Sequence, residues 1–300
     1  MKKLLVITWI IIIASCGNIA DNSQEKDLDV MKTRTDTSRF FVFDLSNFTN
    51  TKILQSVNFA FNADSNIFYF RNNSWDTVLY MINCTSNTFD STITPKFEKS
   101  SLVVYKNNLY VLNFVAPSVP NGVDSLTVYE LSGKKYLKEF AFQYFNDKGY
   151  QEIDFCRKID KSGLIACDVN NNLLYKIYPK SNPEIFSGII SLDSLFFEIK
   201  YYWRSDSLFI EDSLNRVSTF SKNNFDIDFN KKYYMFRRNG KTNLFGTSNN
   251  VSKLYNLPNI NDHNLSLAYS VPIECYSASL KITETAAVWY CNKKLNIVYW

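Results

Sequence analysis

Side chains that could act as acids, bases or metal ligands are few and scattered in this sequence. His263 is the single histidine, so it cannot belong to a histidine-rich metal site, and we assign it to a solvated loop. Residues 168–172 begin like a calcium-binding loop. Because Leu173 stands where that loop requires glycine, we interpret them as a hairpin turn. Asp226 and Asp228 could serve glycoside hydrolysis only if they faced each other across a cleft.

Signatures of nucleophilic or nucleotide chemistry are missing from the sequence. It contains no Gly-x-Ser-x-Gly elbow, no phosphate-binding Gly-Lys-Ser/Thr loop and no dinucleotide fingerprint. We therefore expect no catalytic residue, no cofactor and no metal ion. Whether the protein is an enzyme stays open, and the missing motifs favour a protein without catalytic activity.

Beyond the cysteine near the N-terminus, five more are present: Cys84, Cys156, Cys167, Cys275 and Cys291. An exported protein could oxidise them, and an odd number leaves at least one reduced. Cys156 and Cys167 flank a predicted turn, as do Cys275 and Cys291, so each pair could bridge adjacent strands. Buried free thiols are the alternative, and the sequence does not choose between the two.

The first residues predict an export signal. A basic start precedes the apolar run at residues 4–14, which is too short to span a bilayer comfortably. Residues 13–16, Ile-Ala-Ser-Cys, resemble the lipobox of bacterial lipoproteins, in which the cysteine takes a diacylglyceryl chain and becomes the new N-terminus. The resemblance implies a signal peptide at residues 1–15 and lipidation of Cys16. An ordinary secretory signal with a chance cysteine is the alternative.

A polar tether follows the lipobox. Residues 16–38 would comprise the lipidated cysteine and a segment with too few apolar residues to form a core. Gly17 follows Cys16, so the aspartate that retains some enteric lipoproteins in the inner membrane is missing. The resemblance therefore implies an outer-membrane lipoprotein whose domain faces the periplasm or the cell surface.

A short hairpin repeats along the rest of the chain. In its clearest copy, apolar strands at residues 208–210 and 217–220 flank a polar turn at residues 212–215. One hairpin is at best marginally stable in water, so it must pack against others. The first strands recur about every 35 to 55 residues, which is typical of propeller blades. The further copies begin at residues 67, 109, 164, 244 and 287.

The repeats predict an all-β fold, a β-propeller of about six four-stranded blades over residues 39–300, with five or seven blades as alternatives. Residues 39–45 form a lone strand before the first repeat, and the last repeat runs to Trp300 without an outermost strand. We therefore predict that residues 39–45 pair with residues 295–300. That pairing would close the ring and remove an exposed sheet edge.

Composition agrees with this fold class and narrows the partners. Aromatic residues make up 16% of the chain, and only 8 of its residues are glycine, which favours strands. The formal charge is +4, but two of the basic residues, Lys2 and Lys3, lie in the predicted signal peptide. A nearly neutral domain gives no reason to expect nucleic acid as a partner.

Over residues 39–300 the repeat spacing resembles that of six-bladed propeller lipoproteins of Bacteroidetes. The resemblance implies a binding or scaffolding module, held on the membrane by its lipid, for a glycan, peptide or protein partner. A carbohydrate-active enzyme with acidic residues at the propeller channel is the alternative, and a purely structural envelope component is a third. Convergent carboxylates in the channel would favour the enzyme, whereas an aromatic or neutral polar funnel would favour binding.

Overall fold

Strands account for almost all of the secondary structure in the computed structural model. It describes residues 40–44, 58–71, 77–97, 99–115, 123–145, 153–169, 171–192, 197–211, 215–231, 233–238, 240–248, 251–257, 266–272, 280–283, 286–291 and 294–299. The chain divides into two units, Met1–Thr35 and Asp36–Trp300, and every described residue belongs to the second. In these ranges no helix has the length and apolar character that a bilayer crossing requires.

Six groups of four antiparallel strands succeed one another along the chain, and we call them blades 1 to 6. Blade 1 contains β2 (Asn58–Asn62), β3 (Ile67–Arg71), β4 (Val78–Asn83) and β5 (Thr88–Ile93). Blade 2 contains β6 (Lys99–Tyr105), β7 (Asn108–Val115), β8 (Asp124–Ser132) and β9 (Lys135–Tyr144). Blade 3 contains β10 (Phe155–Asp160), β11 (Gly163–Asp168), β12 (Leu173–Ile177) and β13 (Glu184–Ser187).

The second half of the chain repeats this order. Blade 4 contains β14 (Ile189–Ser191), β15 (Phe197–Arg204), β16 (Ser207–Glu211) and β17 (Val217–Ser221), followed by the short 3₁₀ helix η2 (Lys222–Asn224). Blade 5 contains β18 (Tyr234–Arg238), β19 (Lys241–Ser248), β20 (Val251–Leu257) and β21 (Ser266–Pro272). Blade 6 contains β22 (Leu280–Ile282), β23 (Ala286–Cys291), β24 (Lys294–Tyr299) and, from the start of the domain, β1 (Phe40–Asp44).

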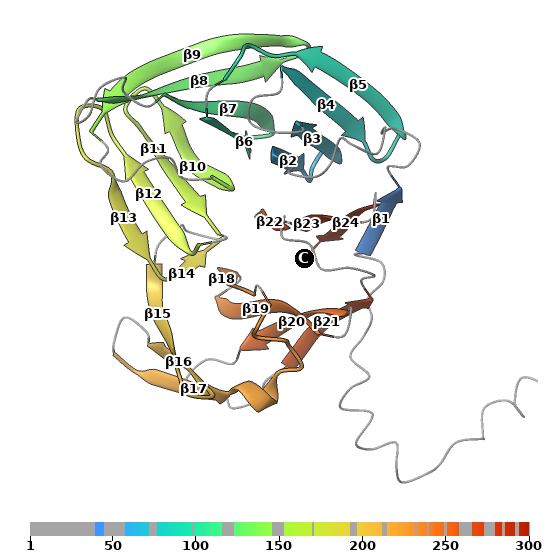
Figure 1. Ribbon diagram of the computed structural model, residues 1–300, viewed down its shortest axis with the longest axis vertical. Helices are drawn as coiled ribbons and strands as arrows, with labels where there is room; N and C mark the ends of the chain where they lie inside the picture. The colour runs from blue at the N-terminus through green and yellow to red at the C-terminus, as the bar shows by residue number, and fades with distance from the viewer. Residues whose placement is uncertain are drawn as a thin grey trace, which may run out of the picture. The chain divides into compact units, whose positions relative to one another are not determined.

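The blades are arranged around a common centre as a six-bladed β-propeller, with the first strand of each blade innermost (Figure 1). Each blade buries apolar side chains against the next one. Shared clusters join blade 1 to blade 2, blade 2 to blade 3, blade 4 to blade 5 and blade 6 to blade 1. A further cluster joins blades 3, 4, 5 and 6. These contacts confirm the predicted fold class and blade number.

The N-terminal strand closes the ring as predicted. β1 pairs antiparallel with β24, in a register that runs from Phe40 opposite Val298 to Asp44 opposite Lys294. The ring of Phe41 meets that of Tyr299 edge to face, with centroids 5.6 Å apart. Residues about 250 positions apart in the chain therefore complete one sheet, and β24 is no longer an open edge.

Two neighbouring blades are also joined through their backbones. β14 and β18, the innermost strands of blades 4 and 5, pair in parallel, with Ile190 opposite Phe236 and Ser191 opposite Arg237. The amide of Leu192 extends the pairing by donating to the carbonyl of Arg237 over 2.7 Å. Blades 4 and 5 consequently form one eight-stranded sheet, and the sequence did not predict this join.

Turn chemistry explains where the hairpins reverse. Lys106, Asn107 and Asn172 adopt positive φ angles of 48°, 66° and 53° in the turns between β6 and β7 and between β11 and β12. Gly163 ends the β10–β11 turn at a φ of 151°, where an added Cβ would lie 2.5 Å from the Tyr178 ring. The carboxylate of Asp160 accepts a hydrogen bond from the Ser162 amide in the same turn, 2.8 Å away.

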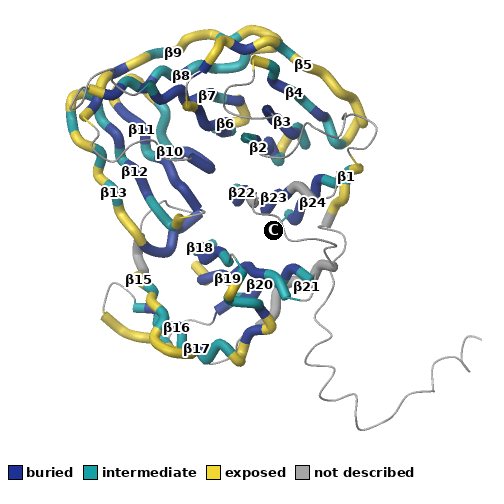
Figure 2. Tube along the Cα trace, in the orientation of Figure 1, coloured by how far each residue is buried: buried dark blue, intermediate teal, exposed yellow. Residues whose placement is uncertain are grey.

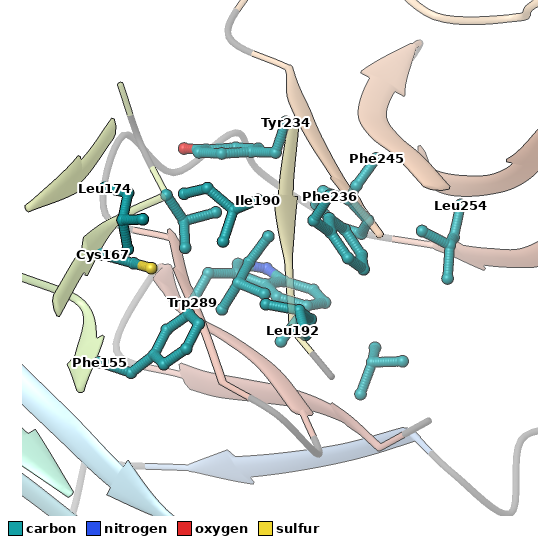
Figure 3. Packing of buried hydrophobic residues seen from close by; sticks show 14 residues of the cluster. Phe155, Cys167, Leu174, Ile190, Leu192, Tyr234, Phe236, Phe245, Leu254 and Trp289 are labelled. Atoms are coloured by element: carbon teal, nitrogen blue, oxygen red, sulfur yellow. The ribbon is translucent and has the colours of Figure 1, made fainter. Parts of the chain in front are cut away.

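Burial decreases from the centre of the ring to its outside (Figure 2). The outermost strand β5 is exposed at most of its positions, whereas β14 is buried throughout. Near the centre, the indole of Trp289 from blade 6 lies between Cys167 and Leu174 of blade 3 and Phe236 and Phe245 of blade 5 (Figure 3). Its ring centroid is 5.9 Å from that of Phe245.

Of the two alternatives for Cys156 and Cys167, the structure has buried free thiols, and no bridge joins the pair. Phe155, not Cys156, lies opposite Cys167 in the β10–β11 register. Side chains alternate between the two faces of a sheet, so this one-residue offset separates the thiols. Cys156 packs between blades 2 and 3, and Cys167 packs in the cluster around Trp289.

Replacing Trp289 by alanine tests the central packing. Because the indole is 3% exposed and contacts three blades, we expect Trp289→Ala to lower the free energy of unfolding by about 3–5 kcal/mol. Urea denaturation followed by circular dichroism measures this. Phe145→Ala, at an aromatic that is 46% exposed, is the matched control and should cost below about 1 kcal/mol. Equal effects of the two substitutions would contradict the packing described here.

Candidate ligand-binding pocket

A pocket of about 380 Å³ lies among four of the six blades. Innermost strands or the turns beside them supply its lining from blades 1, 2, 3 and 6. The lining residues are Ala60, Phe61, Asn62, Ala63, Asp64, Val104, Tyr105, Lys106, Asn107, Asp154, Phe155, Cys156, Arg157, Lys281 and Thr283. The joined strands β14 and β18 contribute none of them, so the lining comes from the other four blades.

Exposure of the lining residues separates a rim from a base. Asp64 in the β2–β3 turn and Lys106 and Asn107 in the β6–β7 turn are exposed. Asp154 and Lys281 are buried, with 6% and 4% of their surface exposed. The pocket therefore has a solvated polar rim and a base in which charges are shielded from water.

A buried ion pair forms the base and joins blade 3 to blade 6. The ammonium of Lys281 lies 3.0 Å from Oδ1 of Asp154, and the side chains are 5% and 0% exposed. Oδ2 of Asp154 accepts a hydrogen bond from the amide of Val169 over 2.7 Å. Lys281 also donates to the carbonyl of Ile153 at 3.4 Å and lies 6.0 Å from the ring centroid of Phe59. Both carboxylate oxygens thus have donors, as a buried charge requires.

Arg157 and Cys156 form part of the wall from β10. Arg157 is half-buried, and its Nη2 donates to the carbonyl of Leu192, just after β14. Cys156 is 3% exposed, and burial raises the pKa of its thiol well above the usual value. Because the thiolate is the nucleophilic form, a thiol held protonated at neutral pH is unsuited to covalent catalysis.

Hydrogen bonds between blades hold the rim. Nδ2 of Asn62 at the end of β2 donates to the carbonyl of Asn107 over 2.8 Å, linking the turns of blades 1 and 2. The ammonium of Lys106 lies 5.2 Å from the centroid of the Tyr105 ring. Deeper in the ring, the Ile153 amide donates to Oγ of Ser101, 3.0 Å away, which links blades 2 and 3. These hydrogen bonds fix the positions of blades 1, 2 and 3 relative to one another at the pocket.

The candidate carboxylates from the sequence do not meet in this pocket. Asp226 forms an ion pair with Lys253, whose hydrogen bond lowers the pKa of that carboxyl. Oδ2 of Asp228 lies 3.8 Å from the ammonium of Lys231, three residues further along the same loop. Each carboxylate thus has a lysine of its own on the surface of blade 5, and neither lines the pocket.

The predicted hairpin turn at residues 168–172 is confirmed between β11 and β12. Oδ1 of Asp168 accepts a hydrogen bond from the amide of Asn171 over 3.0 Å, and Oδ2 accepts one from its side-chain amide over 2.6 Å. Across the ranges that the structure describes, no group of three or more histidine, cysteine or acidic residues is placed to hold a metal ion. Cys16, His263 and Cys275 lie outside the described residues, as does the side chain of Cys291.

Tryptophan and tyrosine side chains outside the pocket lie partly in the core and partly at the surface. Trp289 is a core residue, whereas Tyr202 is 45% exposed and stacks on Phe209 at 5.1 Å. Trp203 donates from its indole nitrogen to the Tyr233 hydroxyl over 2.5 Å, between blades 4 and 5. None of these side chains lines the pocket.

Sequence reasoning missed the charged pocket residues. Neither Asp154 nor Lys281 was singled out from the sequence. A usable signal was present, because Asp154 lies between Ile153 and Phe155, and Lys281 lies between Leu280 and Ile282. A single charged residue within a short apolar strand predicts a buried ion pair or a site, but the sequence does not indicate its partner.

Comparisons with known proteins show only remote likeness. No protein-family profile and no curated protein sequence matches the chain. Among solved structures, a streptogramin B lyase has 10% sequence identity and a TM-score of 0.46, covering 86% of this chain and 97% of that one. Virginiamycin B lyase from Staphylococcus aureus has 11% identity and a TM-score of 0.43, over 87% and 99%. TolB from Acinetobacter baumannii has 13% identity and a TM-score of 0.36, over 72% and 54%.

Likeness at this level carries no argument about activity, so the chemistry must come from the pocket itself. Its described lining contains two carboxylates, Asp64 at the exposed rim and Asp154 in the buried ion pair. An acid–base pair for glycoside cleavage needs two carboxylates flanking one bond, one of them able to give up a proton. Asp154 is committed to Lys281 and Val169 instead. The lining is suited to holding a molecule by contact and charge.

The buried pair can be tested by a double-mutant cycle. Lys281→Met leaves the buried Asp154 carboxylate without its ammonium partner, and Asp154→Asn leaves the buried Lys281 ammonium without its carboxylate partner. We expect each single substitution to lower the free energy of unfolding by about 3–5 kcal/mol. Because the double variant carries no buried charge, it should recover a large part of that loss. Urea denaturation of the four proteins gives the coupling, and additive losses would contradict a direct pair.

Proposed function

We propose that the protein is a binding module of the bacterial cell envelope whose ligand site is the pocket at the centre of blades 1, 2, 3 and 6. One observation carries the proposal, namely the pocket of about 380 Å³ lined from four blades. Its volume lies within the range of small-molecule sites, which combine an apolar wall with a few placed polar groups. Phe61, Val104 and Phe155 provide such a wall beside Asn62, Lys106 and Arg157.

Binding also suits the way the lining is held. Lys281 and Asp154 are fixed by each other, and Asn62 ties the rim turns together. A site whose groups are already positioned loses little conformational entropy when a ligand enters. A purely structural module would gain nothing from charged residues at its centre, because burying them costs free energy that apolar packing avoids.

Attachment to the membrane is the second part of the proposal. The lipobox-like residues 13–16 support removal of residues 1–15 and acylation of Cys16, with residues 16–38 as a tether to the domain at residues 39–300. Each buried acyl carbon contributes about 0.8 kcal/mol, so several chains on one residue would hold the protein firmly. The glycine that follows Cys16 supports an outer-membrane location.

A thermal-shift screen of the purified protein against glycans and peptides tests the binding function. A ligand of the folded state at about 100 times its Kd should raise the Tm by about 5 °C, because it stabilises only that state. Ala63→Trp, at a half-exposed pocket residue, should abolish the shift by filling the site. Ala141→Trp on the exposed face of β9 is the matched control. A ligand that shifts all three proteins equally would place binding elsewhere.

The anchor is tested by replacing Cys16 with alanine. Without a thiol to acylate, the protein should move from the membrane pellet to the soluble fraction of a bacterial expression host, as judged by immunoblotting. Cys84→Ala, at a half-buried cysteine, is the control and should leave the protein in the pellet. Tight membrane association of the Cys16→Ala protein would refute the anchor.

A further inference from the structure

The charges that line the pocket are unequal in number and in depth. Three lining residues are cationic, namely Lys106 at the exposed rim, the half-buried Arg157 and the buried Lys281. Two are carboxylates, Asp64 at the exposed rim and Asp154 at the base. The formal charge of the lining is therefore positive by one unit, and its exposed carboxylate lies at the rim.

The carboxylate at the base does not repel an anion as an isolated charge would. One oxygen of Asp154 meets the Lys281 ammonium at 3.0 Å, and the other accepts the Val169 amide at 2.7 Å. The positive field of Arg157, half-buried in the wall, is screened less than that of a surface arginine would be. An anion that passes the rim thus enters a site whose net charge favours it.

Besides the charged groups, the lining contains apolar side chains. Phe61 and Phe155 are 2% and 4% exposed, and Ala60 and Val104 lie beside them in the lining. Phe61 and Phe155 also pack in core clusters, so only the part of each ring that faces the pocket can contact a ligand, and a molecule carrying only charge would not use it. The occupant that fits both parts has one anionic end and one apolar end.

We propose that the pocket binds a small organic carboxylate with an apolar substituent, the carboxylate lying against Arg157 and Lys106 and the substituent against Phe61 and Phe155. This assignment rests on the binding function proposed above and names its ligand class. A carboxylate against Arg157 gains a charge-assisted hydrogen bond from the guanidinium, in addition to the bond that Nη2 donates to the Leu192 carbonyl. A monoanion matches the single excess charge of the lining, whereas a phosphate monoester carries about −1.5 to −2 at neutral pH.

Isothermal titration with a pair of probes that differ only in charge tests the assignment. N-acetylphenylalanine should bind at least about tenfold more tightly than N-acetylphenylalaninamide, because the amide keeps the ring but cannot form charge-assisted hydrogen bonds. N-acetylglycine keeps the carboxylate without the ring and should also bind at least about tenfold more weakly. N-acetyl-alanyl-phenylalanine, titrated alongside, distinguishes a peptide C-terminus from a free acid as the better occupant.

Two substitutions locate the carboxylate. Lys106→Asn removes a charge at a positive-φ turn position that asparagine tolerates, and Arg157→Gln removes the guanidinium. Each should weaken N-acetylphenylalanine binding about tenfold and leave the amide unaffected. Should Arg157→Gln fail to fold, Arg157→Lys keeps the charge, loses the planar fork, and should still weaken binding. Lys138→Gln on the exposed strand β9 makes the same change of charge away from the pocket and should have no effect.

The outcomes separate this assignment from the binding function. Equal binding of acid and amide, or equal loss in Lys138→Gln and Lys106→Asn, would overturn the carboxylate assignment. Failure of all the probes to bind, while a neutral glycan raises the Tm in a way that Ala63→Trp abolishes, would overturn it too and leave the binding function standing. Failure of every compound in both experiments would overturn both.

Discussion

Each blade depends on its neighbours because a four-stranded sheet cannot cover its own apolar faces. Five apolar clusters fill the spaces between the blades, and together they lead from blade 1 through every other blade and back to blade 1. The pairing of β1 with β24 completes the circle through hydrogen bonds. Stability is therefore distributed around the ring, and no single blade has a core of its own.

Unequal closure of the centre produces the pocket. On one side, β14 and β18 join blades 4 and 5, and the cluster around Trp289 fills the space with apolar side chains (Figure 3). Among the described strands of blades 1 and 2 no innermost pair is joined in this way, and the Asp154–Lys281 pair with the nearby turns leaves a cavity of about 380 Å³. Phe155 belongs to both regions, since it packs in the cluster and lines the pocket.

Most of the fold could be predicted from the sequence, because local patterns determine it. Short apolar strands and polar turns such as residues 168–172 located the hairpins, and the missing outer strand of the last repeat indicated closure by residues 39–45. The pocket could not be predicted, because Asp154 and Lys281 are 127 positions apart and only the closed ring brings them together. Likewise, the β10–β11 register separates Cys156 from Cys167 by a one-residue offset that the sequence does not reveal.

Amide hydrogen exchange across β1 and β24 tests the closed ring most directly. If β1 completes blade 6, its amides that donate to β24 should exchange as slowly as those of β23, because they open only when the ring opens. Exchange of β1 at the rate of an unstructured peptide, with β23 still protected, would contradict the account.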